Sequence, residues 1–181
     1  MIRYLLAVCV ILTVSLNGCT FSGVRPVTVA PAPKAVPTAI IVGDIKVADA
    51  LWDPYRLQFS RGAAEWLKRN GTFPSVLTQP PDQMPAKAVV LVGTITEVDK
   101  GSTALRWIVG MGAGQAKVKG DFEIQSAADG VVLVRFSSRE SYLGGAGIGG
   151  AGFLDMEDLV KRFAETVAEA TVKWAKGETI E

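Results

Sequence analysis

Few residues in this chain of 181 residues could do covalent, metal or acid–base chemistry. It has two cysteines, Cys9 and Cys19, and no histidine. The lack of histidine excludes Ser-His-Asp and Cys-His catalytic sites, and it removes the commonest ligand of zinc and copper. Four carboxylates lie on or near expected strands: Asp99, Asp121, Glu123 and Glu140. Their spacing indicates neither a calcium site nor a pair of glycosidase carboxylates, so we expect no metal, no cofactor and no catalytic residue.

Cys19 follows a segment typical of an export signal. Arg3 gives a basic start, and the residues from Tyr4 to Leu16 are almost all apolar. This run is shorter than the roughly 20 residues of a membrane-spanning helix and fits the ~7–15 residues of a secretory signal. The sequence Leu16-Asn17-Gly18-Cys19 resembles the bacterial lipobox, in which the cysteine thiol receives a diacylglyceryl group.

We therefore predict that residues 1–18 are a lipoprotein signal peptide and that Cys19 is the lipidated mature N-terminus. Asn17 departs from the Ala, Ser or Thr that is usual in a lipobox, and an ordinary signal peptide with an incidental cysteine is the alternative. Each buried lipid CH₂ contributes about 0.8 kcal/mol, so two or more chains hold a protein on a membrane. Thr20 follows the cysteine in place of Asp, the usual inner-membrane retention signal, so the resemblance to lipoproteins implies sorting to the outer membrane. We expect the domain to face the periplasm.

Composition limits the partners of the mature chain. Lys and Arg number 19 and Asp and Glu number 18, so the loss of Arg3 with the signal leaves a formal charge of zero. A neutral chain has no strong electrostatic attraction to nucleic acid, and we expect no such partner. Cys9 is also lost with the signal, and the single remaining cysteine excludes an intramolecular disulfide.

The mature chain is expected to hold one folded domain. Residues 19–38 comprise the lipidated cysteine and a proline-rich stretch, and they predict a tether because proline favours extended backbone without ladder donors. The domain is predicted over residues 39–177, with a tail at 178–181. This length is sufficient for one hydrophobic core.

Strand patterns are clearest in the middle of the domain. A first strand is expected at residues 40–47, and residues 89–98 are rich in β-branched side chains. From Ala116 to Gln125 apolar residues alternate with charged or polar ones, which predicts one dry and one wet face and places Asp121 and Glu123 on the wet face. Turn residues 127–130 then lead into a returning strand, so an antiparallel hairpin is predicted.

Two main helices complete the expected fold. Asp53 and Pro54 supply a cap and a first-turn proline, and Gly71 ends that helix. The second helix follows Asp155 and ends at Gly177, with apolar residues at helical spacing. The predicted fold is α+β: an antiparallel sheet of four or five strands with two main helices packed on one face.

Two glycine-rich segments, residues 104–114 and 143–154, fit neither pattern. The second contains no charged residue, and its residues 145–150 match G-x-G-x-x-G. Dinucleotide binding needs a parallel strand after the following helix, and the chain ends first. A flexible apolar loop is the plain alternative. Close packing on a protein or lipid is the third, because glycine lets backbones approach closely. The candidate interaction surface comprises Trp107, Gly110, Gly112, Gly114, Gly145, Gly147, Ile148 and Gly149.

The run from Gly101 to Gly114, with Arg106 and Trp107 before its Gly-x-Gly-x-Gly turn, carries a family resemblance. It resembles a Gly-rich bacterial lipoprotein family with an N-terminal lipobox, catalogued as a domain of unknown function (family 4410). The resemblance extends roughly from residue 40 to residue 177. It implies no known activity and supplies no catalytic residues.

Two hypotheses follow from these residues. The leading one is a membrane-anchored envelope lipoprotein with a non-enzymatic structural or interaction role, which binds an envelope protein or its own copies. The alternative is a ligand-binding or enzymatic domain that acts on an envelope polymer. A concave pocket with two close carboxylates would favour the alternative, whereas a flat sheet with an exposed glycine loop would favour the leading hypothesis.

Overall fold

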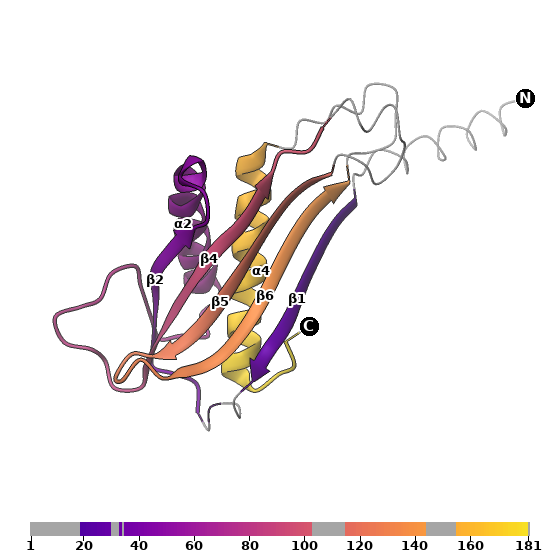
Figure 1. Cartoon of the computed structure of the whole chain (residues 1–181). Helices are drawn as coiled ribbons and strands as arrows, with labels where there is room; N and C mark the ends of the chain where they lie inside the picture. Colours follow the sequence, from indigo (N-terminus) through magenta and orange to yellow (C-terminus); the bar gives the residue numbers. More distant parts are fainter. Residues whose placement is uncertain (1–18, 30–32, 34, 103–114, 144–154, 181) are drawn as a thin grey trace, which may run out of the picture.

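One mixed sheet with two helices on one face makes up the domain (Figure 1). The computed structural model describes residues 19–29, 33, 35–102, 115–143 and 155–180. The strands are β1 (Cys19–Val29), β2 (Ala39–Val47), β3 (Ser75–Leu77), β4 (Ala88–Asp99), β5 (Ala116–Ser126) and β6 (Val132–Leu143). The helices are the short 3-10 helix η2 (Ala50–Trp52), α2 (Asp53–Asn70) and α4 (Met156–Lys176).

The α+β class and the two main helices on one face are confirmed, but the predicted sheet was wrong in detail. It has six strands in the order β1-β6-β5-β4-β2-β3, rather than four or five antiparallel ones. β2 pairs in parallel with both β3 and β4. The reason lies in the connections. α2 returns the chain along the sheet before β3, and residues 78–87 return it before β4, so both strands start at the same end as β2. The β5–β6 hairpin is antiparallel, as predicted.

The largest correction concerns residues 19–38. A tether was predicted there, but residues 19–29 form β1, which pairs antiparallel with β6 from Cys19 opposite Leu143 to Val29 opposite Val134. Pro26 is compatible with a strand because β1 is at the edge of the sheet and its register shifts between Pro26 and Thr28. Residues 19–29 therefore belong to the folded domain, which was predicted to begin at residue 39. It also extends past residue 177, because Ile180 in the predicted tail is buried in the core.

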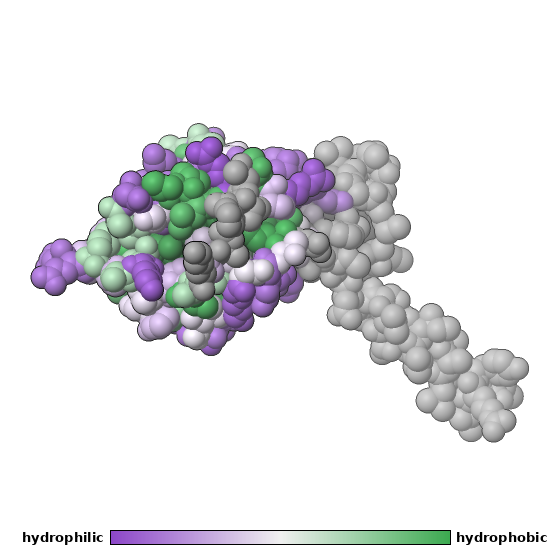
Figure 2. Space-filling model, turned by 90° about the horizontal axis from the view of Figure 1, so that it is seen from below, coloured by the Kyte–Doolittle hydropathy of each residue, from purple (hydrophilic) through white to green (hydrophobic). Residues whose placement is uncertain are grey.

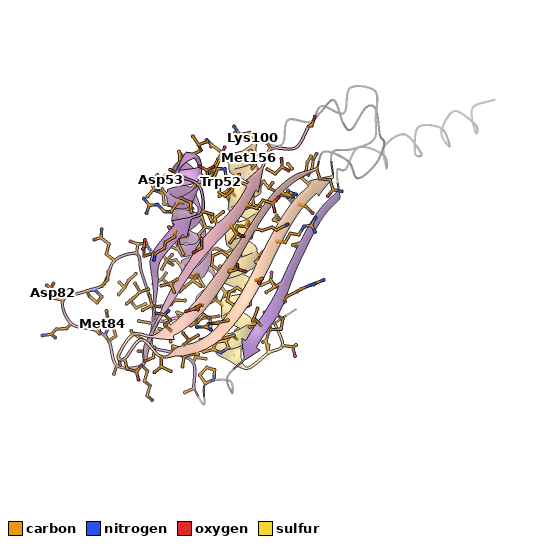
Figure 3. The ribbon with its side chains drawn as sticks, viewed as in Figure 1. Trp52, Asp53, Asp82, Met84, Lys100 and Met156 are labelled. Carbon is orange, nitrogen blue, oxygen red and sulfur yellow. The ribbon has the colours of Figure 1, made fainter. Side chains whose placement is uncertain are left out.

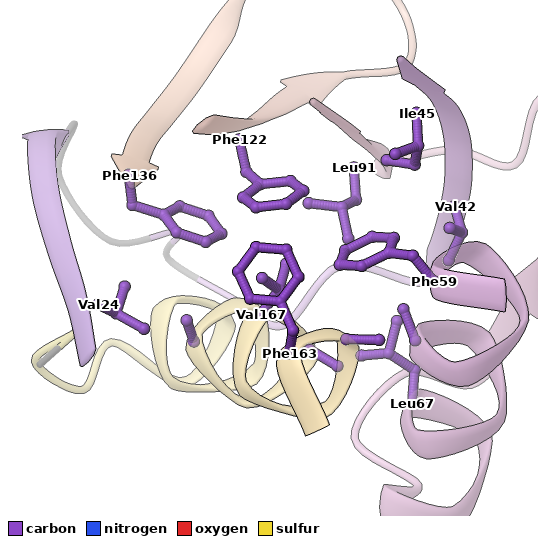
Figure 4. Packing of buried hydrophobic residues seen from close by; sticks show 14 of the residues in the cluster. Val24, Val42, Ile45, Phe59, Leu67, Leu91, Phe122, Phe136, Phe163 and Val167 are labelled. Carbon is purple, nitrogen blue, oxygen red and sulfur yellow. The ribbon is translucent and has the colours of Figure 1, made fainter. Parts of the chain in front are cut away.

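Four stacked or tilted phenylalanines form the centre of the core, between the sheet and the helices (Figure 4). The ring centroid of Phe122 on β5 lies 5.2 Å from that of Phe59 on α2, and 5.7 Å from that of Phe163 on α4. Phe136 on β6 completes the set at 5.8 Å from Phe122. The Phe122 ring lies over Gly93 of β4, where an added Cβ would be 2.3 Å from its Cδ1 atom. Glycine at this position therefore makes room for the ring.

Capping residues mark both ends of α4 and the C-terminal end of α2. The Asp155 carboxylate accepts a hydrogen bond from the Glu157 amide, and Gly177 ends α4 with a φ of 76°. Gly71 ends α2 in the same left-handed conformation. Asp53 was predicted as the cap of α2, but Trp52 occupies that position and Asp53 lies in the first turn. Within the described residues, neither helix is apolar enough over a sufficient length to cross a bilayer.

Candidate functional site

Cys19, the predicted lipid site, is the first residue of β1 and is paired with Leu143 at the last residue of β6. The same end of the sheet holds the last residue of β4, Asp99, and the first residue of β5, Ala116. We call it the Cys19 end. The backbone position of Cys19 is therefore fixed by its pairing in the sheet, whereas the predicted tether would have left it free.

The candidate interaction surface lies outside the described residues. Trp107, Gly110, Gly112 and Gly114 fall within residues 103–114, and Gly145, Gly147, Ile148 and Gly149 fall within residues 144–154. The described residues show what these segments connect: the first joins β4 to β5, and the second joins β6 to α4. Both segments therefore leave the sheet at the Cys19 end. β6 pairs antiparallel with β1 and β5, which is not the parallel arrangement of a dinucleotide-binding unit.

The outer face of the sheet, opposite α2 and α4, carries the predicted wet-face carboxylates. An open hollow of about 510 Å³ lies there, lined by residues of β2, β4, β5 and β6 together with Val27. Asp121 and Glu123 both line it, as do Asp44 and Lys46. The ligand-binding or enzymatic alternative requires a concave pocket with two close carboxylates. The hollow supplies the concave surface and places carboxylates in its lining.

Both β5 carboxylates in the hollow already have partners within the sheet. Ser137 Oγ donates to Asp121 Oδ1 at 2.7 Å. Arg135 Nε donates to Glu123 Oε1 at 2.6 Å, and Gln125 Nε2 donates to Glu123 Oε2 at 2.8 Å. These cross-strand and same-strand contacts are what stabilises the open face of a sheet. Among the described residues, no group of three or more His, Cys, Asp or Glu could hold a metal ion.

A second set of ion pairs lies nearer the Cys19 end of the outer face. Lys117 and Lys119 of β5 both approach Glu97 of β4, at 2.6 Å and 2.7 Å. Hydrogen bonds from these two ammonium groups lower the pKa of Glu97, and the Glu97 partner raises the pKa of Lys117. Asp99 is a weaker partner of Lys117, at 3.7 Å. The outer face thus combines both signs of charge in neighbouring strands.

Glu140 differs from the other three carboxylates because it is on the inner face, only 3% exposed. Burial raises its pKa to about 6, while a hydrogen bond from Thr166 and the positive charge of Arg162 oppose that rise. The Thr166 Oγ1 atom of α4 is 3.2 Å from Glu140 Oε2. The sequence placed Glu140 on or near the sheet without assigning its face. Val134, Phe136 and Ser138 alternate along β6 and are all buried. Continuing this alternation to Glu140 could have assigned its side chain to the inner face.

Comparison with known proteins supports the family resemblance. Residues 64–146 match the family model described as "Domain of unknown function (DUF4410)", which confirms the resemblance over that part of the chain. The matched region is shorter than the range of residues 40–177 expected from the sequence. It includes the glycine-rich run that suggested the family. No curated protein matches the chain.

Solved structures share the fold at low sequence identity. The PelC dodecamer from Paraburkholderia phytofirmans is 16% identical, with a TM-score of 0.53, and the match covers 88% of this chain and 99% of that one. Protein XCC0632 from Xanthomonas campestris is 9% identical, with a TM-score of 0.56, over 83% and 95% of the two chains. At these identities the likeness concerns the fold alone, so function must be argued from this chain's own residues.

Proposed function

We propose that this chain is a bacterial envelope lipoprotein, anchored by lipid on Cys19 to the periplasmic side of the outer membrane, with a non-enzymatic structural or interaction role. The observation that carries the proposal is the export signal that ends in Leu16-Asn17-Gly18-Cys19. The start of β1 at Cys19 supports it, because cleavage before that cysteine would leave this strand whole. The family match is to a domain of unknown function, so the non-enzymatic role rests on the residues of this chain.

The lipid anchor is tested by replacing its acceptor atom. Cys19→Ser lacks the thiol that receives the diacylglyceryl group, so we expect an uncleaved precursor without incorporated labelled fatty acid. Cys9→Ser is the matched control, because it changes the other cysteine within the same signal and should be processed and labelled normally. Uptake of label by Cys19→Ser would contradict the proposal.

The interaction role includes association with an envelope protein or with further copies of this chain. The PelC structures that share this fold are dodecamers, and self-association is accordingly the first partner to test. The test is crosslinking in intact cells, followed by identification of the captured chains. Gly147→Asp and Ile148→Asp fall in the predicted interaction surface and should abolish the crosslink, because a charge buried in an apolar contact is costly. Normal crosslinking by both folded variants would exclude that segment as the contact.

The outer-face hollow favours a second candidate function, binding of an envelope polymer. Its Asp121, Glu123 and Arg135 side chains offer hydrogen-bond donors and acceptors on a concave surface. Cosedimentation with isolated peptidoglycan separates the two candidates. Binding that Asp121→Asn and Glu123→Gln together abolish would favour the second. No cosedimentation of the unaltered protein would exclude peptidoglycan as the polymer.

A further inference from the structure

The position of Cys19 in the sheet determines how a lipid anchor would hold the domain. β1 pairs with β6 from Cys19 itself, which lies opposite Leu143. Val24, five residues further along, is 8% exposed and belongs to the core. Five extended residues span at most about 18 Å. A lipid on Cys19 would therefore keep the core within that distance of the anchored residue.

A particular set of residues shares the Cys19 end. Trp52 and Asp53, where α2 begins, lie at that end together with Lys100, which follows β4, and Met156, which begins α4 (Figure 3). Asp82 and Met84, in the connection between β3 and β4, lie at the opposite end (Figure 3). The two ends are separated by the length of the strands, which for the 12 residues of β6 is about 40 Å.

The broad sides of the domain do not suit contact with a bilayer interior. The outer face carries Lys117, Lys119 and Glu97 in ion pairs. The helix layer exposes Arg61 and Glu65 on α2, and Lys161 is exposed on α4. Removing such charges from water costs far more than lipid contact returns. The opposite end, seen from below in Figure 2, carries both hydrophobic and hydrophilic patches.

We propose that the domain stands end-on upon the bilayer, with the Cys19 end against the lipid headgroups and no linker between lipid and sheet. This inference rests on the proposed lipidation of Cys19 and adds the membrane-facing surface of the domain. The far end, with the loop that contains Asp82 and the β5–β6 turn, then projects into the periplasm. A partner that binds the opposite end would lie about one strand length from the membrane.

The orientation can be measured by energy transfer from single labelled positions to the membrane surface. Lys100→Cys and Asp82→Cys are matched probes, since both native side chains are exposed and both replace a charged residue. Acylation of Cys19 and loss of Cys9 would leave each introduced thiol unique. The lipidated full chain is reconstituted in phosphatidylethanolamine–phosphatidylglycerol vesicles that contain a headgroup-labelled acceptor lipid. We expect several-fold more transfer from position 100 than from position 82.

Insertion of a linker provides the second measurement. A Gly-Ser insert of about 20 residues between Cys19 and Thr20 has a root-mean-square length of roughly 25 Å, and it should lower the transfer from position 100. Equal transfer from both positions in anchored protein would overturn the end-on orientation but not the lipid anchor. Unchanged transfer from position 100 after the insertion would also overturn it. Failure of the purified chain to associate with vesicles would instead contradict the proposed function.

Discussion

The inner and outer faces of the sheet are stabilised by different kinds of contact. On the inner face, Phe122 fits over Gly93 and stacks on Phe59, so the contact depends on shape. On the outer face, Arg135 pairs with Glu123 and Lys119 pairs with Glu97, at sites open to solvent. A closely packed core tolerates little change in side-chain shape. Exposed ion pairs, in contrast, typically contribute about 0–1 kcal/mol to the free energy of unfolding. The inner face therefore determines the stability of the fold far more than the ion pairs of the outer face do.

The largest expected effect comes from emptying an aromatic site on the inner side. Phe163→Ala should lower the free energy of unfolding by about 3–5 kcal/mol, because Phe163 is fully buried and contacts both Phe59 and Phe122. Glu123→Gln, on the outer face, should lower it by less than about 1 kcal/mol. Urea denaturation measures both. Similar losses for the two variants would show that the faces do not differ in the way described.

A smaller but sharper test adds a single methyl group to a glycine. Gly93→Ala should cost about 3 kcal/mol, because its Cβ would be 2.3 Å from the Phe122 ring and 2.7 Å from the Asp121 carbonyl oxygen. Gly23→Ala is the matched control in β1, where an added Cβ has nothing within 4 Å. Its thermal midpoint should stay close to that of the unaltered protein. A Gly93→Ala variant as stable as Gly23→Ala would mean that Phe122 can move away without cost.

The sequence predicted some elements of the fold correctly and missed others. Alternation along residues 116–125 predicted the wet face of β5 correctly, and the terminal residues located α4, whereas the cap of α2 was predicted one residue too late. The parallel pairing of β2 with β4 was missed, because an apolar strand pattern does not specify its neighbour or direction. β1 was missed because Pro26, together with the prolines that follow the strand, indicated a tether, although an edge strand accepts proline. The candidate interaction residues remain a prediction, since they lie outside the described residues.

Glu140 is an ionisable group on the inner face, among side chains that are mostly apolar. Its pKa rises from 4.5 to about 6 in the folded protein, chiefly through burial. The folded state therefore binds this proton more tightly than the unfolded state does. The resulting stabilisation is fully present below pH 4.5 and is lost as the pH rises through about 6. A shift of this size corresponds to about 2 kcal/mol.

Glu140→Gln should remove that part of the pH dependence. The amide stays neutral at every pH and keeps an oxygen that can accept from the Thr166 hydroxyl, which now bonds to Glu140 Oε2. We expect the variant to gain up to about 2 kcal/mol on the unaltered protein between pH 4 and pH 8, as measured by urea denaturation at a series of pH values. Glu65→Gln, at an exposed position of α2, is the control and should reproduce the unaltered pH profile. If Glu140→Gln follows that same profile, water must reach the carboxylate, and the inner face is then less completely closed near Arg162 than its burial indicates.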